Sequence, residues 1–135
     1  MRIVLDTNVL LAAFIAHGAC SDLLEHCALQ HTIVLSPFII NEMTAKLTGR
    51  FRFTAAEAGD VVLLLKSKAE IVTPAPLPRR VCRDHDDDAI IATAITGRCD
   101  CIVTGDKDLL VLKRVKAVHI ISSGHFWKFE DRFLS

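Results

Sequence analysis

The sequence has little of several features that define particular protein classes. No apolar run is long enough for a membrane helix, which needs about 18–20 residues; two of the longest cover only residues 9–16 and 61–65. No secretory signal is visible, because Met1 and Arg2 lead directly into a β-branched run that ends at an acid. Net charge is also absent, since 16 Lys and Arg residues balance 16 Asp and Glu residues. We therefore expect a soluble, cytoplasmic protein that binds no membrane, and any binding of nucleic acid must come from local patches of charge.

Cysteine pairs of the C-x-x-C type are missing as well. The chain has an odd number of cysteines, namely Cys20, Cys27, Cys82, Cys99 and Cys101. With 135 residues, of which 51% are hydrophobic, it can bury a core without disulfide bridges. We expect one domain over residues 1–135 with reduced thiols. Cys99 and Cys101 would share one face of a strand and could bind a soft metal, but burial as small hydrophobic residues is the favoured interpretation.

Short β-branched segments alternate with segments of helical periodicity. Strands are expected over residues 2–5, 32–35, 70–73, 101–104 and 118–121. Helices are expected over residues 9–16, 21–29, 89–96, 109–115 and 126–134, with two more beginning after Ser36 and near Thr54. This alternation predicts an α/β protein with a parallel sheet that helices cover on both faces.

Local signals fix some of the boundaries between these elements. Ser36 and Pro37 suit the N-cap and the first position of a helix. Thr54 and Glu57 have the spacing of a capping box, and Gly97 suits a helix C-cap. Three prolines within residues 74–78 predict an extended loop.

Four acids follow four successive strands of this pattern. Asp6 ends the first strand, Glu42 lies in the helix after the second, Asp88 begins the helix after the third, and Asp106 follows the fourth. Ligands of open α/β sheets bind at the carboxyl ends of the strands, where these acids would meet. Two carboxylates 4 Å apart repel by about 4 kcal/mol at an effective dielectric near 20, so the group needs protons or cations. Oxygen ligands suit Mg²⁺ or Mn²⁺, and such ions promote phosphodiester hydrolysis.

Four motifs in order resemble the PIN-domain ribonucleases. They are VLDTNVLL at residues 4–11, SPFIINE at 36–42, RDHDDDAIIA at 83–92 and VTGDKDLL at 103–110, followed by SSGHFWKF at 122–129. Within that family the resemblance is closest to toxin components of VapBC-like toxin–antitoxin pairs. It implies a three-layer α/β/α fold with a five-stranded parallel sheet and an Mg²⁺- or Mn²⁺-dependent endoribonuclease acting on single-stranded RNA. It also implies a homodimer or higher oligomer and a cognate antitoxin protein.

The resemblance assigns roles residue by residue. The matching catalytic acids are Asp6, Glu42, Asp88 and Asp106, and the implied metal ligands are Asp6, Asp88, Asp106 and the accessory Asp108. Which of Asp86, Asp87 and Asp88 faces the metal is open; Asp88 is chosen because the run at residues 89–92 follows it in the family's register. One departure is His85, where relatives often have proline. Candidate substrate contacts are Asn8, Thr104, Arg50 and Arg83.

Each of these residues also has an ordinary structural interpretation. Asp6 could cap the following helix, Glu42 could pair with Lys46 one turn away, and Asp106 and Asp108 could be turn residues that cap a helix. Thr104 and Asn8 could bond to their own backbone turns rather than to metal-bound water or substrate. An aromatic stripe over residues 126–133 packs in the core or at a dimer contact. No role is assigned to histidines that lack metal-ligand spacing, namely His17, His26, His31, His119 and His125.

Other functions remain open at this point. A haloacid-dehalogenase-like phosphatase also has an acid after its first strand, but it usually has a second Asp where this chain has Asn8. A phosphoacceptor receiver domain should have an acidic pair after the first strand and a Lys after the fifth, where this chain has Ser122 and Ser123. A non-catalytic module that binds RNA or a protein partner would keep the fold without turnover.

Overall fold

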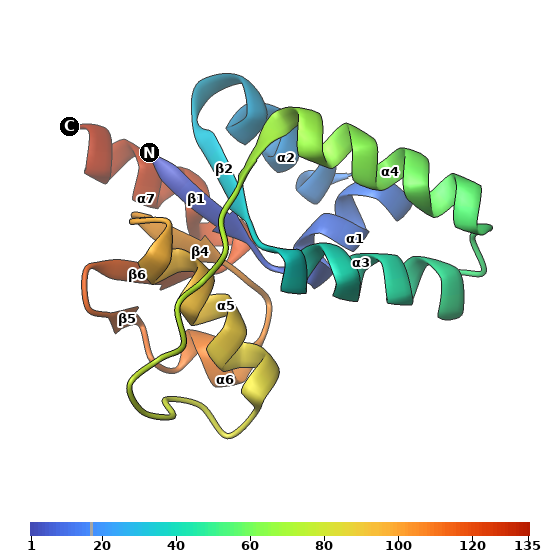
Figure 1. Cartoon of the computed structure of the whole chain (residues 1–135). Coiled ribbons are helices and arrows are strands. Elements are labelled where there is room, and N and C mark those ends of the chain that lie inside the picture. Colours follow the sequence, from blue (N-terminus) through green and yellow to red (C-terminus); the bar gives the residue numbers. More distant parts are fainter. Residues whose placement is uncertain (17) are drawn as a thin grey trace.

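The protein folds into three layers, with one sheet between two layers of helices (Figure 1). The computed structural model describes residues 1–16 and 18–135. Its sheet has six strands in the order β3-β2-β1-β4-β6-β5. The strands are β1 (Arg2–Leu5), β2 (Thr32–Leu35), β3 (Ala69–Ile71), β4 (Cys101–Val103), β5 (Arg114–Val115) and β6 (Val118–Ile121). The expected α/β class and its three layers are confirmed.

The helices lie on both faces of this sheet. They are α1 (Thr7–Ile15), α2 (Ala19–Gln30), α3 (Pro37–Gly49), α4 (Ala55–Lys68), α5 (His85–Thr96), α6 (Lys107–Leu110) and α7 (Phe126–Leu134), and a 3₁₀ turn, η1 (Ser123–His125), precedes the last. Helix α5 packs against β1, β2 and β4, whereas α1, α2 and α7 lie on the opposite side (Figure 1). Helices α3 and α4 pack against each other and project beyond the sheet (Figure 1).

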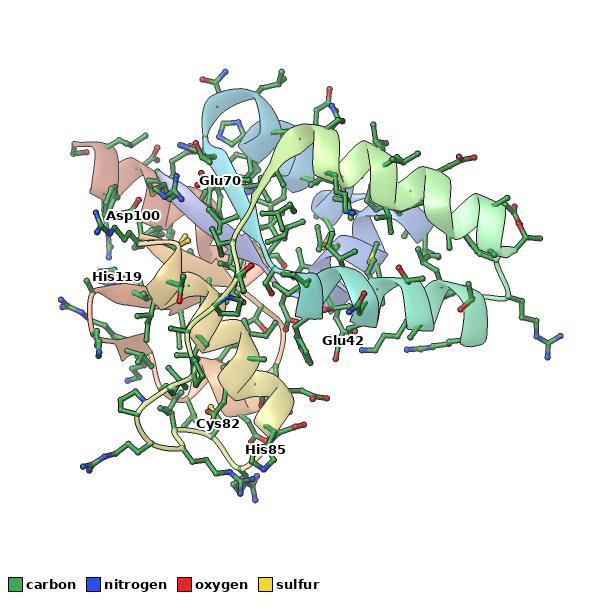
Figure 2. The ribbon with its side chains drawn as sticks, in the orientation of Figure 1. Glu42, Glu70, Cys82, His85, Asp100 and His119 are labelled. Carbon is green, nitrogen blue, oxygen red and sulfur yellow. The ribbon has the colours of Figure 1, made fainter. Side chains whose placement is uncertain are left out.

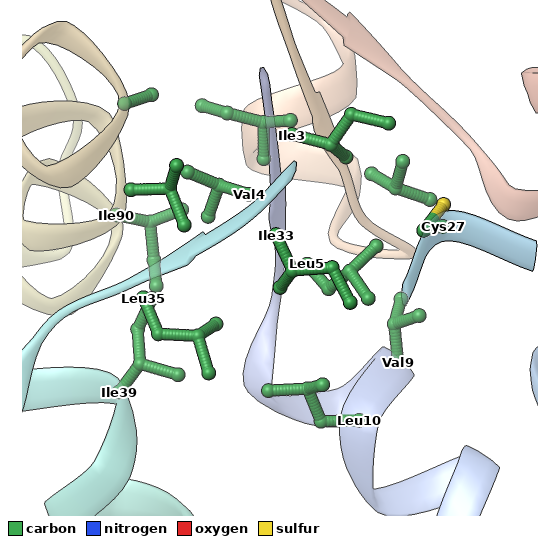
Figure 3. Close-up of a cluster of buried hydrophobic side chains, with 14 of the residues drawn as sticks. Ile3, Val4, Leu5, Val9, Leu10, Cys27, Ile33, Leu35, Ile39 and Ile90 are labelled. Carbon is green, nitrogen blue, oxygen red and sulfur yellow. The ribbon is translucent and has the colours of Figure 1, made fainter. Parts of the chain in front are cut away.

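The central strands are apolar along their whole length because they are buried on both faces. Ile3, Val4 and Leu5 of β1 are all fully buried. In Figure 3, Val4 lies toward Ile90 of α5, while Leu5 lies toward α1 and α2 on the other side. The core therefore fixes the register of β1 against its neighbours, where Ile3 pairs with Ile33 of β2 and with Cys101 of β4.

One edge of the sheet differs from the expected five parallel strands. The helix expected over residues 109–115 ends at Leu110, and Arg114–Val115 forms β5, which pairs antiparallel with β6. Lys113 and Lys116 adopt positive φ values of 60° and 52°, which turn the chain at both ends of this short strand. The sheet is therefore mixed and has six strands.

Two of the expected helix caps are confirmed. Thr54 and Glu57 form the capping box at the start of α4. Gly97 is the C-cap of α5, but its φ is −76°, and the left-handed residue is Arg98, with φ 52°. A Cβ atom at position 97 would lie 2.7 Å from Cγ1 of Val34, so this glycine lets the end of α5 approach β2 closely.

All five cysteines are free in the described part of the chain, and four of them are buried. Burial raises the pKa of the thiols of Cys27, Cys82 and Cys99 to about 12. This confirms the expectation of unbridged cysteines packed as small hydrophobic residues. Across the two described ranges, no single helix has the length and apolarity to cross a membrane; only α1 and α2, bent by 109°, meet both criteria jointly.

Candidate active site

The parallel pairing of β1 with β4 places Asp6 beside Thr104 at the carboxyl edge of the sheet. Leu5 is in register with Val103, so the next residue of each strand lies side by side. The amide of Asp6 donates to the carbonyl of Val103 (3.0 Å). The hydroxyl of Thr104 donates to Oδ2 of Asp6 (2.6 Å) and accepts from the amide of Asp106 (3.0 Å). One buried threonine thereby fixes the orientation of two of the expected acids.

The carboxylates of Asp87 and Asp106 also come together at this edge. Asp106 follows β4 at the N-cap of α6, and Asp87 lies in the first turn of α5. With Asp108 they form a group in which one carboxylate oxygen from each residue lies within 4.8 Å of the others. Asp87 is buried, Asp106 is half-buried and Asp108 is exposed. Three carboxylates thus converge from two elements that are distant in the sequence.

Asp88 does not face this group, which corrects the expectation from the sequence. Its carboxylate turns back to the preceding loop and accepts hydrogen bonds from the amides of Cys82 (2.7 Å) and Val81 (3.2 Å). The reason is the phase of α5. Its buried face includes Ile90, Ile91 and Ala94, and Asp87 precedes these residues by three, four and seven positions, so it shares their face.

Glu42 approaches the cluster from α3 and is half-buried near the start of that helix (Figure 2). Its charge contributes to raising the pKa of Asp6. The alternative ion pair between Glu42 and Lys46 does not form. The Nζ of Lys46 instead donates a hydrogen bond to Oδ1 of Asn8 (3.2 Å). Helix α3 therefore presents an acid close to Asp6.

Crowding and burial shift the protonation of this cluster. Burial raises the pKa of Asp6, the hydrogen bond from Thr104 opposes the shift, and the charges of Glu42 and Asp106 add to it. Burial also raises the pKa of Asp87 to about 7, with a further contribution from its contact with Asp106. These acids therefore cannot all hold a full negative charge at neutral pH without a compensating cation.

The residues present fit a divalent cation. Carboxylate oxygens are the ligands that Mg²⁺ and Mn²⁺ prefer, and the charge of such an ion would remove the repulsion between Asp87 and Asp106. The hydroxyl of Thr7, directly after Asp6, is buried and has no hydrogen-bond partner among the residues that the structure describes. Buried acids with raised pKa values at Asp6 and Asp87 indicate a functional site rather than a solvated surface.

The expected substrate contacts lie in different places. Arg83 is exposed next to the cluster, where its guanidinium pairs with Asp108 (3.1 Å). Asn8 is exposed on the first turn of α1. Arg50 lies at the far end of α3, eight residues or about 12 Å along the helix from Glu42, over the ring of Phe51. Thr104 is 0% exposed, so its hydroxyl positions Asp6 and cannot contact RNA, which corrects that expectation.

The ordinary structural roles hold in part. Asp106 does cap α6, since its Oδ1 accepts from the amide of Asp108 (2.9 Å). Asp84 caps α5 in the same way through the amide of Asp86 (2.9 Å). Asp6 occupies the N-cap of α1, but its side chain makes no capping bond there. His85 is exposed at the start of α5 (Figure 2), so the departure from proline does not alter the acid cluster itself.

Comparison with known proteins identifies the fold and the family of this chain. The VapBC2 complex of Rickettsia felis bound to a promoter DNA fragment contains a similar fold, with a TM-score of 0.66 and 17% identity over 90% of this chain and 98% of the matched chain. VapBC-1 of nontypeable Haemophilus influenzae has a TM-score of 0.64 and 14% identity over 92% and 99% of the two chains. No curated protein matches the sequence. The PIN-domain family profile matches residues 2–108. The chain therefore belongs to the PIN-domain family, whose members are typically metal-dependent nucleases.

Proposed function

We propose that this protein is an Mg²⁺- or Mn²⁺-dependent endoribonuclease that cleaves single-stranded RNA and acts as the toxin of a toxin–antitoxin pair. The observation that carries the proposal is the convergence of Asp6, Asp87 and Asp106 at the carboxyl edge of a PIN-domain sheet. Asp6 and Asp87 are buried and have raised pKa values, so a bound cation would stabilise their charged forms. We also propose that the protein acts in the cytoplasm, where its RNA substrate and a bacterial antitoxin would be found.

In this proposal Asp6, Asp87 and Asp106 hold the metal, with Asp108 as an accessory ligand. Asp87 takes the place that the sequence assigned to Asp88. A bound divalent ion would polarise a phosphoryl oxygen and lower the pKa of water at the scissile phosphate. Glu42 is a further ligand of the ion or orients the attacking water, and Thr104 keeps Asp6 in place. Arg83 exchanges its contact with Asp108 for a phosphate oxygen of the RNA.

An antitoxin needs a surface to bind, and an apolar groove between α2 and α4 has suitable chemistry. The groove has a volume of about 410 Å³, and its lining includes Phe14, Leu24 and Leu64. Leu29, which also lines the groove, and Leu63, next to Leu64 in the chain, are 74% and 68% exposed and add to this apolar surface. Since the two solved structures named above are VapBC complexes, we propose that an apolar helix or strap of the antitoxin covers this groove.

The proposed homodimer rests on the family resemblance and on exposed aromatic residues of the last helix. The expected aromatic stripe is divided, because Phe126 is fully buried whereas Trp127 and Phe133 are 42% and 45% exposed. Such large exposed rings are enriched at protein interfaces. Light scattering of the purified chain would measure its oligomeric state directly.

The phosphatase and binding-module alternatives are tested together with the nuclease. A mixed single-stranded RNA pool and a chromogenic phosphate monoester are incubated with wild type and with Asp6→Asn, in Mn²⁺, Mg²⁺ or EDTA. We expect RNA cleavage by wild type with metal only. Asp60→Asn, which changes an exposed acid on α4, is the matched control and should retain full activity.

Far-ultraviolet circular dichroism would verify that Asp6→Asn keeps the fold. Turnover of the monoester without RNA cleavage would favour the phosphatase. Binding of RNA without cleavage under any metal condition would favour the module. Full activity of Asp6→Asn would contradict the assigned site.

A further inference from the structure

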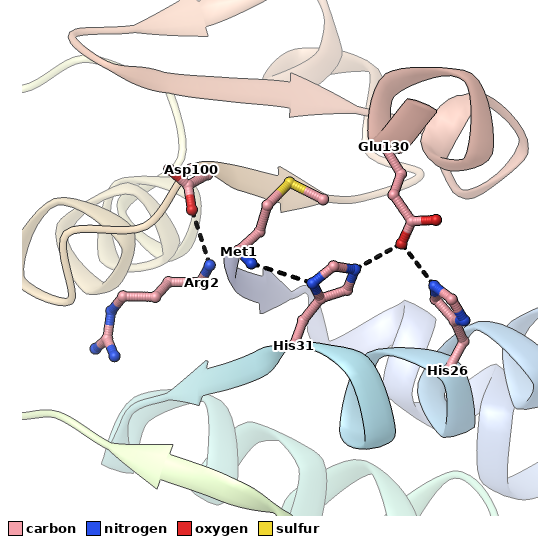
Figure 4. A network of polar contacts seen from close by, with 6 residues as sticks. All are labelled: Met1, Arg2, His26, His31, Asp100 and Glu130. Carbon is pink, nitrogen blue, oxygen red and sulfur yellow. Dashed lines mark hydrogen bonds and ion pairs between the residues drawn. The ribbon is translucent and has the colours of Figure 1, made fainter. Parts of the chain in front are cut away.

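A second cluster of metal-ligating side chains lies at the opposite, amino edge of the sheet (Figure 4). Oε2 of Glu130 lies 2.6 Å from Nε2 of His26 and 2.5 Å from Nε2 of His31. Each imidazole ring thus points its Nε2 atom at the same carboxylate oxygen of Glu130. The three ligand atoms all lie within 4.8 Å of one another. No role for these histidines was expected from the sequence; His17, also given no role, lies outside the described residues.

The cluster joins three segments that are distant in sequence or separate in structure. His26 lies on α2, His31 precedes β2, and Glu130 lies on α7. The ring of His26 packs edge-on against that of Trp127, with centroids 4.7 Å apart. Nδ1 of His31 lies 3.1 Å from the main-chain nitrogen of Met1, which fixes the orientation of this ring (Figure 4). Ring packing therefore holds His26 in place, and the contact with Met1 holds His31.

The environment of the cluster is also that of a coordination site. The side chains of His31 and Glu130 are only 4% and 14% exposed, so water competes weakly for their polar atoms. A pocket of about 250 Å³, lined by Met1, Gln30 and Leu134 in addition to the three ligands, opens onto the cluster. This pocket provides an entry path and space for a water molecule as a fourth ligand. Two imidazoles and one carboxylate with an open fourth position form a ligand set that suits Zn²⁺.

We propose that His26, His31 and Glu130 form a Zn²⁺ site that is separate from the nuclease site and fastens α7 to α2 and to the amino edge of the sheet. In the metal-free protein, Glu130 accepts hydrogen bonds from both rings. On binding, each Nε2 lone pair would coordinate Zn²⁺ and each neutral ring would carry its proton on Nδ1. At His31 this Nδ1–H would face the main-chain nitrogen of Met1, which would release one proton to solvent and accept the hydrogen bond as a neutral amine. The site differs in chemistry from the acid cluster, which has oxygen ligands only. Its proposal does not depend on the nuclease activity.

The experiment uses this chemical difference to separate the two sites. The full chain is saturated with excess Mg²⁺, which occupies oxygen-only sites and competes poorly for imidazole. Zn²⁺ is then titrated by calorimetry, and Co²⁺ is titrated as a spectroscopic substitute whose visible bands report coordination geometry. Absence of an intense near-ultraviolet thiolate band would show that the cysteines are not the ligands. Thermal melting with and without Zn²⁺ gives a readout that needs no RNA.

We expect one equivalent of Zn²⁺ to bind wild type in the presence of Mg²⁺ and to raise its melting temperature. His26→Asn, which alters the more exposed of the two rings, should weaken binding by more than about 100-fold, beyond the usual effect of outer-shell changes. Glu130→Gln keeps a hydrogen-bond acceptor and tests the carboxylate alone. The matched control is His125→Asn, a surface histidine outside the cluster, which should bind Zn²⁺ as wild type does.

Two results would overturn the proposal. One is the absence of Zn²⁺ binding by the Mg²⁺-saturated wild type. The other is undiminished binding by folded His26→Asn and Glu130→Gln, which would place the metal elsewhere. Loss of RNA cleavage in the assay above would leave both readouts unchanged, so failure of the nuclease proposal and failure of this one are distinguishable.

Discussion

At the carboxyl edge of the sheet, Asp87 and Asp106 face each other, whereas at the amino edge Glu130 lies between two imidazole rings (Figure 4). Burial and neighbouring acids raise the pKa of Asp87. Burial alone would also raise the pKa of Glu130, but hydrogen bonds from His31 and His26 outweigh it and lower this pKa. The two edges therefore differ. Asp87 has acidic neighbours and needs a cation, whereas Glu130 already accepts hydrogen bonds from two histidines. Stability of the carboxyl edge should depend strongly on a bound cation, whereas the amino edge should be stable without a bound cation.

The largest expected effect separates two adjacent acids at the carboxyl edge. Asp87→Asn should lower metal-dependent RNA cleavage by more than about 100-fold, because it removes a direct ligand of the proposed ion. Asp88→Asn, the matched control, weakens the hydrogen bonds to the amides of Val81 and Cys82 and should mainly lower stability. Initial cleavage rates under saturating Mn²⁺, measured alongside thermal melting, distinguish the two. The reverse pattern would restore Asp88 as the acid that faces the metal.

The pH dependence of stability should reveal the crowded edge without any substrate. The pKa of Asp87 is raised to about 7 in the folded protein, from about 3.9 in an unfolded chain. Between about pH 4 and pH 7 the folded state therefore binds a proton that the unfolded state has released, so stability falls as pH rises. Such a shift corresponds at most to about 4 kcal/mol, and solvent on the open side of the cluster reduces it to roughly 2 kcal/mol.

Urea unfolding of the metal-free protein across this range measures that slope. Saturating Mg²⁺ should remove it by stabilising the charged form, and Asp87→Asn should remove it by eliminating the titrating group. A metal-free protein whose stability rises through the same window would contradict the assignment of crowding to this edge.

The smallest expected effect concerns Glu130 at the amino edge. Its pKa is lowered on folding, so stability changes with pH in the opposite direction to that expected for Asp87. Because the pKa of Glu130 is lowered on folding, its contribution is present above about pH 4 and is lost as pH falls through the folded pKa. Glu130→Ala leaves buried Nε2 of His31 without its acceptor and should cost about 1–2 kcal/mol at pH 7. Glu70→Gln, which removes the charge of the exposed partner of Arg2, serves as the control and should lower stability less than Glu130→Ala does. If both variants unfold alike at pH 7, the cluster contributes no more than a surface ion pair.

Much of the fold could be predicted from local patterns, because buried parallel strands and capped helices leave strong signals. The bounds of β1, β2, β6 and α7 agree with the sequence prediction. Strand β5 was missed because its turns use lysines at positive φ, where a glycine would have marked the turn. The structure favours Asp87 over Asp88 as the acid that faces the cluster. The sequence prediction aligned Asp88 with the family motif. The buried residues Ile90 and Ala94 instead define the inner face of the helix, and Asp87 lies on that face.

The amino-edge cluster could be predicted from the sequence only in part. His26 and His31 have four residues between them, a spacing found between metal-binding histidines, and this signal was missed. Glu130 gave no signal, because it lies 104 residues from His26. Only the docking of α7 beside α2 brings them together. By contrast, the acids of the carboxyl edge follow from topology, since strands that run in parallel end at the same side. Sites built by strand order are therefore visible in a sequence, and sites built by helix docking are not.

The outermost strands have a consequence for how this protein can associate. One edge of the sheet is β3, with three residues, and the other is β5, with two, and each carries a charged side chain, Glu70 or Arg114. Such short, charged edges present few free amides and carbonyls, so they are poor templates for adding a strand from another chain. The sheet is thereby protected from edge-to-edge aggregation. Any stable association with a second copy or with another protein must use helix surfaces instead.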